Sequence, residues 1–167
     1  MIVGRRLPRP LPAVAISAVV AVAACSSSGP TERAADVPGG VDSPTELSTF
    51  DLRPGDCLVA PDDIQAKLGS IDAVPCDDPH DFEVFALADY DDSDTFPGED
   101  ELNDFADGQC ITDFLGYTGD DYLDSELFVT YLLPTIESWN SADRTDRTAV
   151  CLLTDPSRQR SSSAAAE

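Results

Sequence analysis

The sequence predicts an α+β fold: a small, mostly antiparallel sheet with one main helix packed on one face, stapled by disulfides. Three observations predict it. Short apolar segments of strand length recur along the middle of the chain, one longer segment places apolar residues at helical spacing, and four cysteines lie in the same region. That region, residues 50–156 of the 167-residue chain, has the size of one small domain.

Four segments match strands in length and apolar content: residues 57–60, 82–90, 127–133 and 148–154. The second is apolar on both of its faces, which is typical of a central strand. Pro134 ends the third, because proline cannot donate a ladder hydrogen bond. Residues 62–68, between the first two, are expected to form a single helical turn or a loop.

The main helix is expected over residues 99–115, after an acidic loop at residues 91–98. Four apolar residues recur at every fourth position along one face: Leu102, Ala106, Cys110 and Phe114. Three acidic residues at the start favour a helix N-terminus, and Gly116 is the expected C-cap.

The first 25 residues have the parts of a bacterial export signal. Three arginines precede residues 13–24, which are apolar apart from Ser17, and small residues lead to Cys25. The apolar segment is shorter than the roughly 20 residues that a membrane-spanning helix needs. Residues 22–25 therefore match a lipobox, which makes residues 1–24 a lipoprotein signal peptide and Cys25 the lipid-modified residue.

Two alternatives concern this signal. An ordinary signal peptidase could cleave after the small residues, which would leave Cys25 incidental. The Arg5-Arg6 pair also raises the twin-arginine export route, although its flanking residues match that signal poorly. The sequence leaves Sec and twin-arginine export open.

The segments on either side of the domain are expected to be flexible. Residues 25–49 are rich in Ser, Pro, Gly, Thr and Asp and hold few large apolar residues, which is typical of a tether. Residues 157–167 end in Ser and Ala and are expected to form a disordered tail. Together with Cys25, this organisation predicts a protein anchored by lipid to the extracellular face of the cell membrane.

The composition is strongly acidic, with 10 basic and 32 acidic residues and a formal net charge of −22. Cleavage of the signal peptide removes three arginines and no acid, so the mature chain is more negative still. This charge argues against nucleic acid as a partner and favours a cationic one. A solvated acidic surface without a specific partner is the simpler explanation of the composition.

Lipidation of Cys25 leaves an even number of cysteines for disulfides: Cys57, Cys76, Cys110 and Cys151. Four cysteines allow three pairings, and the sequence alone does not choose among them. We favour Cys57 with Cys76 and Cys110 with Cys151, because the second pair would tie the helix to the last strand. A thiolate metal site is the rival interpretation, but no Cys-x-x-Cys pair supports it.

Five motifs follow one another within residues 50–154: Gly55-Asp56-Cys57, residues 74–85 (VPCDDPHDFEVF), Cys110 in a helix, residues 134–139 (PTIESW) and residues 146–151 (DRTAVC). Together they resemble the septum formation family, a domain of actinobacterial envelope proteins. The block from Cys76 to Phe85 is the most specific part. The resemblance implies an extracytoplasmic domain linked by name to septum formation, with no established enzymatic activity.

One motif departs from the family pattern, which has Gly-Asp-Arg between the tryptophan and the last cysteine. Ala142 stands where the glycine is expected, and the Asp-Arg-Thr triplet is doubled. Arg144 keeps the expected distance from Trp139, whereas Arg147 keeps it from Cys151. The sequence leaves open which arginine is equivalent, and it predicts a local loop insertion.

His80, Asp81 and Glu83 are the candidate catalytic group, because imidazole and carboxylates supply general bases and metal ligands. In a strand, Asp81 and Glu83 would share one face and His80 would point to the other. No nucleophile motif accompanies them. The favoured interpretation is a turn before the central strand, capped by His80 or Asp81, with no catalytic residue, metal ligand or cofactor predicted.

Asp89, Asp91 and Ser93 have the first spacings of a calcium loop. Asp94 replaces the glycine that the sharp turn of such a loop needs, and Pro97 stands at the ninth position. A solvated acidic loop is the favoured interpretation.

Trp139, the single tryptophan, could stack on a sugar or peptide ring, or pack in the core with an arginine on its face. The residues of the predicted binding surface are His80, Asp81, Glu83, Trp139, Arg144 and Arg147.

These observations predict a membrane-anchored, extracytoplasmic lipoprotein that is a non-catalytic binding or assembly module of the cell envelope. Its expected partners are the membrane, through the lipid on Cys25, and an envelope protein or wall component. The alternatives are an envelope hydrolase or metal-dependent enzyme centred on His80, Asp81 and Glu83, and a purely structural spacer.

Overall fold

The computed structural model of the protein describes residues 39–61 and 69–166. The predicted signal peptide, the lipid-modified Cys25 and the expected turn at residues 62–68 lie outside the described residues. Within the described part of the chain, no helix has both the length and the apolar character needed to cross a membrane.

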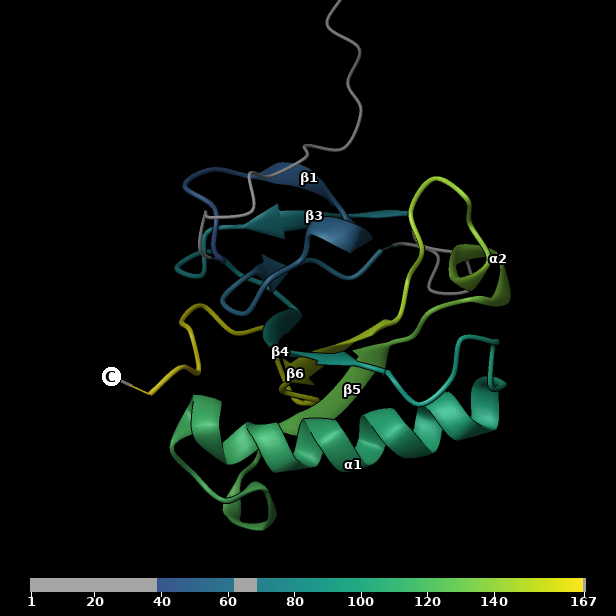
Figure 1. Ribbon diagram of the computed structural model, residues 1–167. Helices are drawn as coiled ribbons and strands as arrows, with labels where there is room; N and C mark the ends of the chain where they lie inside the picture. The colour runs from purple at the N-terminus through teal and green to yellow at the C-terminus, as the bar shows by residue number, and fades with distance from the viewer. Residues whose placement is uncertain (1–38, 62–68, 167) are drawn as a thin grey trace, which may run out of the picture.

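Six strands form one antiparallel sheet (Figure 1): β1 Thr45–Ser48, β2 Cys57–Leu58, β3 Ser70–Val74, β4 Phe82–Asp89, β5 Phe128–Leu132 and β6 Thr148–Thr154. Their order across the sheet is β1-β3-β2-β4-β6-β5, and every pair of neighbours is antiparallel. The long strand β4 lies inside the sheet, as its apolar character on both faces predicts. The α+β fold class is confirmed.

The main helix, α1, spans Glu99–Thr118 and runs along the side of the sheet that carries β4, β5 and β6 (Figure 1). The four residues of its predicted apolar stripe are its buried residues: Leu102, Ala106, Cys110 and Phe114. The predicted end at Gly116 is wrong, because the helix continues to a left-handed C-cap at Gly119 (φ 77°). The extra residues are held by their own contacts, since Thr118 Oγ1 donates to the carbonyl of Phe114 at 3.0 Å.

Apolar side chains bury both faces of the sheet. Along β6, Val150 and Leu152 belong to one cluster, whereas Cys151 and Leu153 belong to the other. This alternation follows from the two-residue period of a strand. The second cluster lies between the sheet and α1, where the rings of Phe85 and its helix partners pack.

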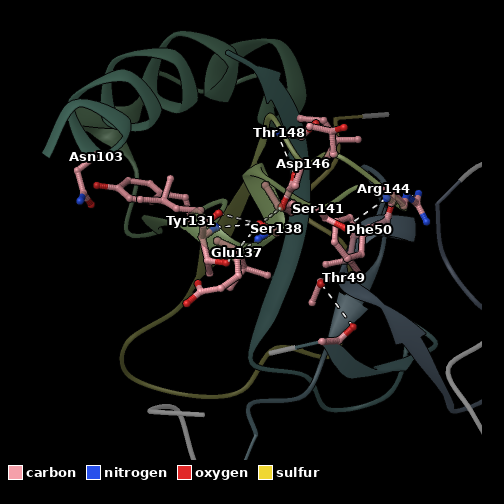
Figure 2. Close-up of a pocket in the computed structure, with 18 residues that line it drawn as sticks. Thr49, Phe50, Asn103, Tyr131, Glu137, Ser138, Ser141, Arg144, Asp146 and Thr148 are labelled. Carbon is pink, nitrogen blue, oxygen red and sulfur yellow. Dashed lines mark hydrogen bonds between the residues drawn. The ribbon is translucent and has the colours of Figure 1, made fainter. Parts of the chain in front are cut away.

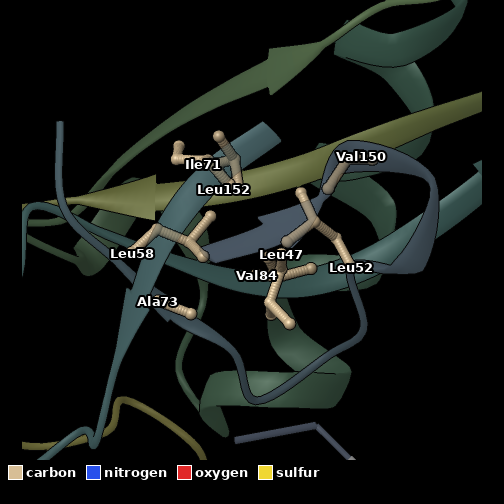
Figure 3. Close-up of a cluster of buried hydrophobic side chains, with 8 residues drawn as sticks. All are labelled: Leu47, Leu52, Leu58, Ile71, Ala73, Val84, Val150 and Leu152. Atoms are coloured by element: carbon tan, nitrogen blue, oxygen red, sulfur yellow. The ribbon is translucent and has the colours of Figure 1, made fainter. Parts of the chain in front are cut away.

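The first cluster lies on the face opposite α1, where strands from both ends of the sheet meet (Figure 3): Leu47, Leu52, Leu58, Ile71, Ala73, Val84, Val150 and Leu152. Leu47 belongs to β1 and Leu152 to β6, although several strands separate these two in the sheet. The sheet therefore curls, so that its β1 edge faces the strands at the other end.

The two favoured disulfides are present in the structure. Cys57 pairs with Cys76, with a Cα–Cα distance of 5.3 Å, and Cys110 pairs with Cys151 at 5.5 Å. The second bond joins the buried face of α1 to the strand β6, across the main core. Both Cα separations suit an unstrained disulfide.

Two strands lie where the sequence predicts none. β1 falls at the end of the segment expected to be a tether, and its register pairs Leu47 with Ile71 of β3. β1 has one apolar residue, Leu47, and β3 is a short segment with Ile71, Ala73 and Val74, so both depend on pairing: β3 lies between β1 and β2 in the sheet. The short helix α2 (Ile136–Trp139) and the 3₁₀ turns η1 (Thr49–Asp51) and η2 (Tyr122–Asp124) complete the fold.

The C-terminal residues, for which a disordered tail is expected, make specific contacts. His80 and Arg160 exchange two backbone hydrogen bonds of 2.9 Å, as an isolated antiparallel bridge. Farther along, the N–H of Ala166 donates to the carbonyl of Tyr117 at the end of α1, at 2.8 Å. The composition of this segment does not reveal these bonds, because its backbone groups make most of them.

Candidate functional site

A groove of about 970 Å³ lies where the curled sheet opens between its two ends. One wall comes from Thr49, Phe50 and Leu52 and the other from β5 and β6, and α2 and the segment after it close one side. Figure 2 shows Asn103 and Tyr131 toward one end of this groove, Phe50 and Arg144 toward the other, and Ser138 between them.

The apolar part of the groove comes from strands β4, β5 and β6 and from residues that follow η1 and β5: Leu52, Leu87, Tyr131, Leu132, Leu133 and Val150. Leu87 is 41 % exposed, although it stands in the middle of the interior strand β4. Tyr131 and Leu132 are consecutive residues of β5, and successive side chains of a strand point to opposite faces. The groove therefore reaches the free edge of β5, which pairs only with β6 in the described sheet.

The polar part of the groove is held by α2. Thr135 and Ser138 form a capping box, in which each side chain accepts from the backbone N–H of the other residue. The Ser138 hydroxyl also lies 3.2 Å from a carboxylate oxygen of Asp146. This fixes α2 against the segment that carries the doubled triplet.

Arg144, from the first triplet, reaches across the groove to η1. Its guanidinium donates to the carbonyl of Phe50 at 2.9 Å and to the carboxylate of Asp51 at 3.1 Å. It also lies 5.0 Å from the centre of the Phe50 ring. The Arg144 side chain is half exposed, so this contact forms a polar rim rather than a core bond.

Arg147, from the second triplet, lies on the face of Trp139, 3.7 Å from the ring centroid. It donates to the carbonyl oxygens of Trp139 at 2.9 Å and Asp94 at 3.1 Å. Trp139 is 1 % exposed, packs against Tyr90 and Phe96, and donates from its indole N–H to Asp94. The tryptophan is therefore a core residue with an arginine on its face, and no part of it is open for a sugar to stack on.

This difference between the two arginines predicts unequal effects of one conservative substitution. Arg147→Lys is expected to lower the free energy of unfolding by about 2 kcal/mol, because lysine keeps the charge but loses the stacked plane and one of the hydrogen bonds. Arg144→Lys, in the other triplet, is expected to cost less than about 0.5 kcal/mol at its exposed position. Urea denaturation of the two variants measures this, and equal losses would contradict it.

His80 and Glu83 are fully buried, each 0 % exposed. His80 Nδ1 lies 2.9 Å from the carbonyl of Asp78. The Glu83 carboxylate accepts hydrogen bonds from the Tyr117 hydroxyl at 2.7 Å, from the Ser163 hydroxyl and from the N–H of Ala164 at 2.8 Å. Burial, and then the bond to Glu83, raise the pKa of Tyr117 above its usual value.

Asp81 is only partly buried and closes the turn before β4. Its carboxylate accepts from the backbone N–H of Ala60 at 2.8 Å and from the side chain of Gln159 at 3.1 Å. His80 and Glu83 would point to opposite faces only within one strand, and β4 begins at Phe82, after His80. A ring nitrogen of His80 and a carboxylate oxygen of Glu83 instead lie within 4.8 Å of each other.

The structure separates the predicted binding surface into distinct places. His80, Asp81 and Glu83 gather at the start of β4, under the C-terminal residues. Trp139 and Arg147 lie in a third apolar cluster with Tyr90, just after β4 ends. Arg144 alone lines the groove.

In the acidic loop after β4, the side chains of Asp89 and Ser93 form hydrogen bonds with neighbouring residues instead of pointing to one shared calcium position. Asp89 accepts from the Thr148 hydroxyl of β6 at 2.7 Å, and the Ser93 hydroxyl bonds to Thr95. Among the described residues, the single group of His, Cys, Asp or Glu side chains close enough to share a metal ion is Cys57, His80 and Glu83.

Residues 45–166, most of the chain, match the model of the septum formation family. The chain belongs to this family. Two relatives, each described as "Putative lipoprotein LppN", come from Mycobacterium tuberculosis (strain ATCC 25618 / H37Rv) and Mycobacterium bovis (strain ATCC BAA-935 / AF2122/97). Each is 28 % identical over 166 residues, covering 89 % of this chain and 91 % of its own. No solved structure matches the chain.

Sequence reasoning misses most of the groove in this septum formation domain. Its lining comes from segments far apart in the chain, among them Phe50, Leu87 and Tyr131. Leu87 carries no local signal, because in the sequence it looks like a buried residue of a central strand and its exposure appears only in the structure. The other lining residues look like ordinary strand and loop residues until the sheet curls.

Proposed function

We propose that this septum formation protein is an extracytoplasmic lipoprotein, held to the membrane through Cys25, whose domain is a non-catalytic binding module of the cell envelope. The groove is its binding site, and the ligand is an extended, cationic segment of an envelope protein. The match to the septum formation family and the lipoprotein relatives support the location and the link to septum formation.

The observation that carries the proposal is the composition of the groove. It combines an exposed apolar floor at Leu87 and Tyr131, hydroxyl groups on α2, and the free edge of β5. An unpaired strand edge offers backbone donors and acceptors to an extended peptide, and the neighbouring side-chain pockets give selectivity.

Charge selects the kind of segment. Glu137 and Asp146 line the groove, whereas its one lining arginine, Arg144, already pairs with Asp51. The whole chain carries a net charge of −22. Basic side chains on the ligand would therefore be attracted over a long range and would meet acidic groups at the site.

The burial of His80 and Glu83 is the reason to prefer binding over hydrolysis. A general base has to reach the proton that it removes, within hydrogen-bond distance or through one water. Both side chains are 0 % exposed, and the carboxylate is engaged by three donors. Among the residues that the structure describes, those that line the groove include no histidine or cysteine.

A matched pair of exposed leucines tests the site. Leu87→Lys places a positive charge on the groove floor, where it would repel a cationic ligand, whereas Leu123→Lys makes the same change at an 89 % exposed position outside the groove. We expect Leu87→Lys to remove septal localisation of a tagged copy while Leu123→Lys keeps it, with both proteins folded and lipidated.

A photo-crosslinking residue at position 87 should then give one discrete protein adduct in cells, and the same residue at position 123 should not. Adduct formation with wall glycan instead of protein would overturn the choice of ligand. Normal localisation of the folded Leu87→Lys variant would overturn the groove as the site.

A further inference from the structure

Three side chains of different ligand chemistry meet in the core beneath the C-terminal residues. The Sγ atom of Cys57, a ring nitrogen of His80 and a carboxylate oxygen of Glu83 all lie within 4.8 Å of one another. Each of the three residues is 0 % exposed. A thiolate, an imidazole and a carboxylate are the three ligand types that zinc takes from proteins.

His80 has a free coordinating atom in this group. Its Nδ1 lies 2.9 Å from the carbonyl of Asp78, and a carbonyl only accepts, so Nδ1 is the donor in this contact. In the tautomer with its hydrogen on Nδ1, the ring keeps a lone pair on Nε2. Among the described residues this buried atom has no hydrogen-bond partner. A buried polar atom without a partner is rare and calls for an explanation such as an ion.

Glu83 also keeps capacity for a ligand. One carboxylate oxygen accepts from the hydroxyls of Tyr117 and Ser163, and the other accepts only from the N–H of Ala164. An ionised carboxylate has about four lone-pair positions, so the second oxygen can accept one more partner. These three donors would hold the carboxylate in one orientation, just as hydrogen bonds from neighbouring groups hold the ligands of known metal sites.

The oxidation state of Cys57 determines whether this group can bind a metal ion. In the structure its sulfur is bonded to Cys76, and a disulfide sulfur lacks the charge of the thiolate that binds metals. Cys76 is partly exposed, whereas Cys110 and Cys151 of the other disulfide are both 0 % exposed. An external thiol therefore reaches the Cys57–Cys76 bond first.

We propose that Cys57, His80 and Glu83 form a zinc site that the Cys57–Cys76 disulfide keeps closed and that reduction opens. A thiolate of an external dithiol attacks Cys76 Sγ, the S–S bond breaks, and its electron pair leaves on Cys57. The second thiol of the reductant then attacks the mixed disulfide, which releases Cys76 and leaves the dithiol oxidised. The two electrons come from the dithiol.

Zinc then replaces the cystine bond as the link in this region. The Cys57 thiolate, His80 Nε2 and a Glu83 oxygen supply three ligands. Zinc bonds of about 2.0 to 2.3 Å place neighbouring ligand atoms roughly 3.5 Å apart. The three atoms, now within 4.8 Å of one another, have to approach by at most about 1.3 Å, and cleavage of the S–S bond frees the Cys57 sulfur to move.

Two variants with one free thiol each test the site without any reductant. Cys76→Ser leaves the Cys57 thiol in the buried group, and Cys57→Ser leaves the Cys76 thiol outside it. Both keep the Cys110–Cys151 bond. With the full processed chain in detergent, we expect Cys76→Ser to bind one Zn²⁺ per chain, at least about 100-fold more tightly than Cys57→Ser.

Co²⁺ provides a readout that a structural role would not give. Its complex with Cys76→Ser should show thiolate-to-cobalt charge-transfer absorption, which Cys57→Ser should lack. Adding His80→Gln to Cys76→Ser should weaken metal binding by about 10- to 100-fold or more. Equal affinities of Cys76→Ser and Cys57→Ser, or no loss with His80→Gln, would overturn the proposal.

If Cys76→Ser does not fold, the wild-type chain provides a second test. After reduction with a phosphine, which does not compete for zinc as a thiol does, the wild-type protein should bind Zn²⁺. It should release the Zn²⁺ when the disulfide is formed again. Reduced wild-type protein that stays folded and binds no Zn²⁺ would overturn the proposal as well.

Discussion

Cys25→Ser is expected to move nearly all of the protein from the membrane fraction to the soluble fraction. Serine cannot carry the thioether-linked lipid, and the described part of the chain offers no helix that could hold the protein in a bilayer. Each buried CH₂ of an acyl chain contributes about 0.8 kcal/mol, and two or more chains give stable attachment where one gives weak attachment. Fractionation followed by immunoblotting measures the change.

Mass spectrometry of the same fractions provides the control. Wild-type protein should carry the mass of the lipid, and Cys25→Ser should carry none. Ser26→Ala, one position along, should behave as wild type. A variant retained only by its uncleaved signal peptide shows the precursor mass, which separates that outcome from lipid attachment. A lipid-modified Cys25→Ser protein would contradict Cys25 as the anchor.

Removal of the Cys110–Cys151 disulfide is expected to lower the free energy of unfolding by about 4 kcal/mol, on the loop-closure account of disulfides. The bond closes a sequence separation of 41 residues and joins α1 to β6 across the main core. Replacing both cysteines by alanine avoids burying new hydroxyl groups at two fully buried positions. Urea denaturation under non-reducing conditions measures the loss.

The matched control is the double alanine variant of Cys57 and Cys76. Their separation is 19 residues, so the same account gives about 3 kcal/mol. Because Cys76 is partly exposed, mild reduction should break this bond before the other. A larger loss from the Cys57 and Cys76 change, or a loss below about 1 kcal/mol from Cys110 and Cys151, would contradict the assignment of the main staple.

The long elements could be predicted because their patterns are local. The stripe of α1 and the continuous apolar run of β6 appear in the sequence at the positions that the structure buries. β1 and β3 could not be predicted in the same way, because they are short and depend on pairing, β3 with both β1 and β2. The helix end shifted from Gly116 to Gly119 because contacts of the last turn outweighed the glycine signal.

The candidate site shows the same difference between what local sequence patterns predict and what long-range packing decides. Sequence motifs identified Arg144 and Arg147 as a pair and left their roles open. The structure assigns Arg147 to the face of Trp139 and Arg144 to the rim of the groove. It also removes His80 and Glu83 from the surface, which no pattern of residue types reveals, because the C-terminal residues that cover them lie about 80 positions away.

The sequence by itself determined the acidic charge, the family resemblance and the fold class, and it predicts the export signal and the lipid-modified cysteine, because each of these depends on composition or on residues close together in the chain. The tertiary structure decided the groove and the buried group of Cys57, His80 and Glu83. It also decided the different positions of Arg144, at the groove, and Arg147, on the face of Trp139. Those depend on how far the sheet curls and on which distant segments cover it, and long-range packing rather than local preference sets both.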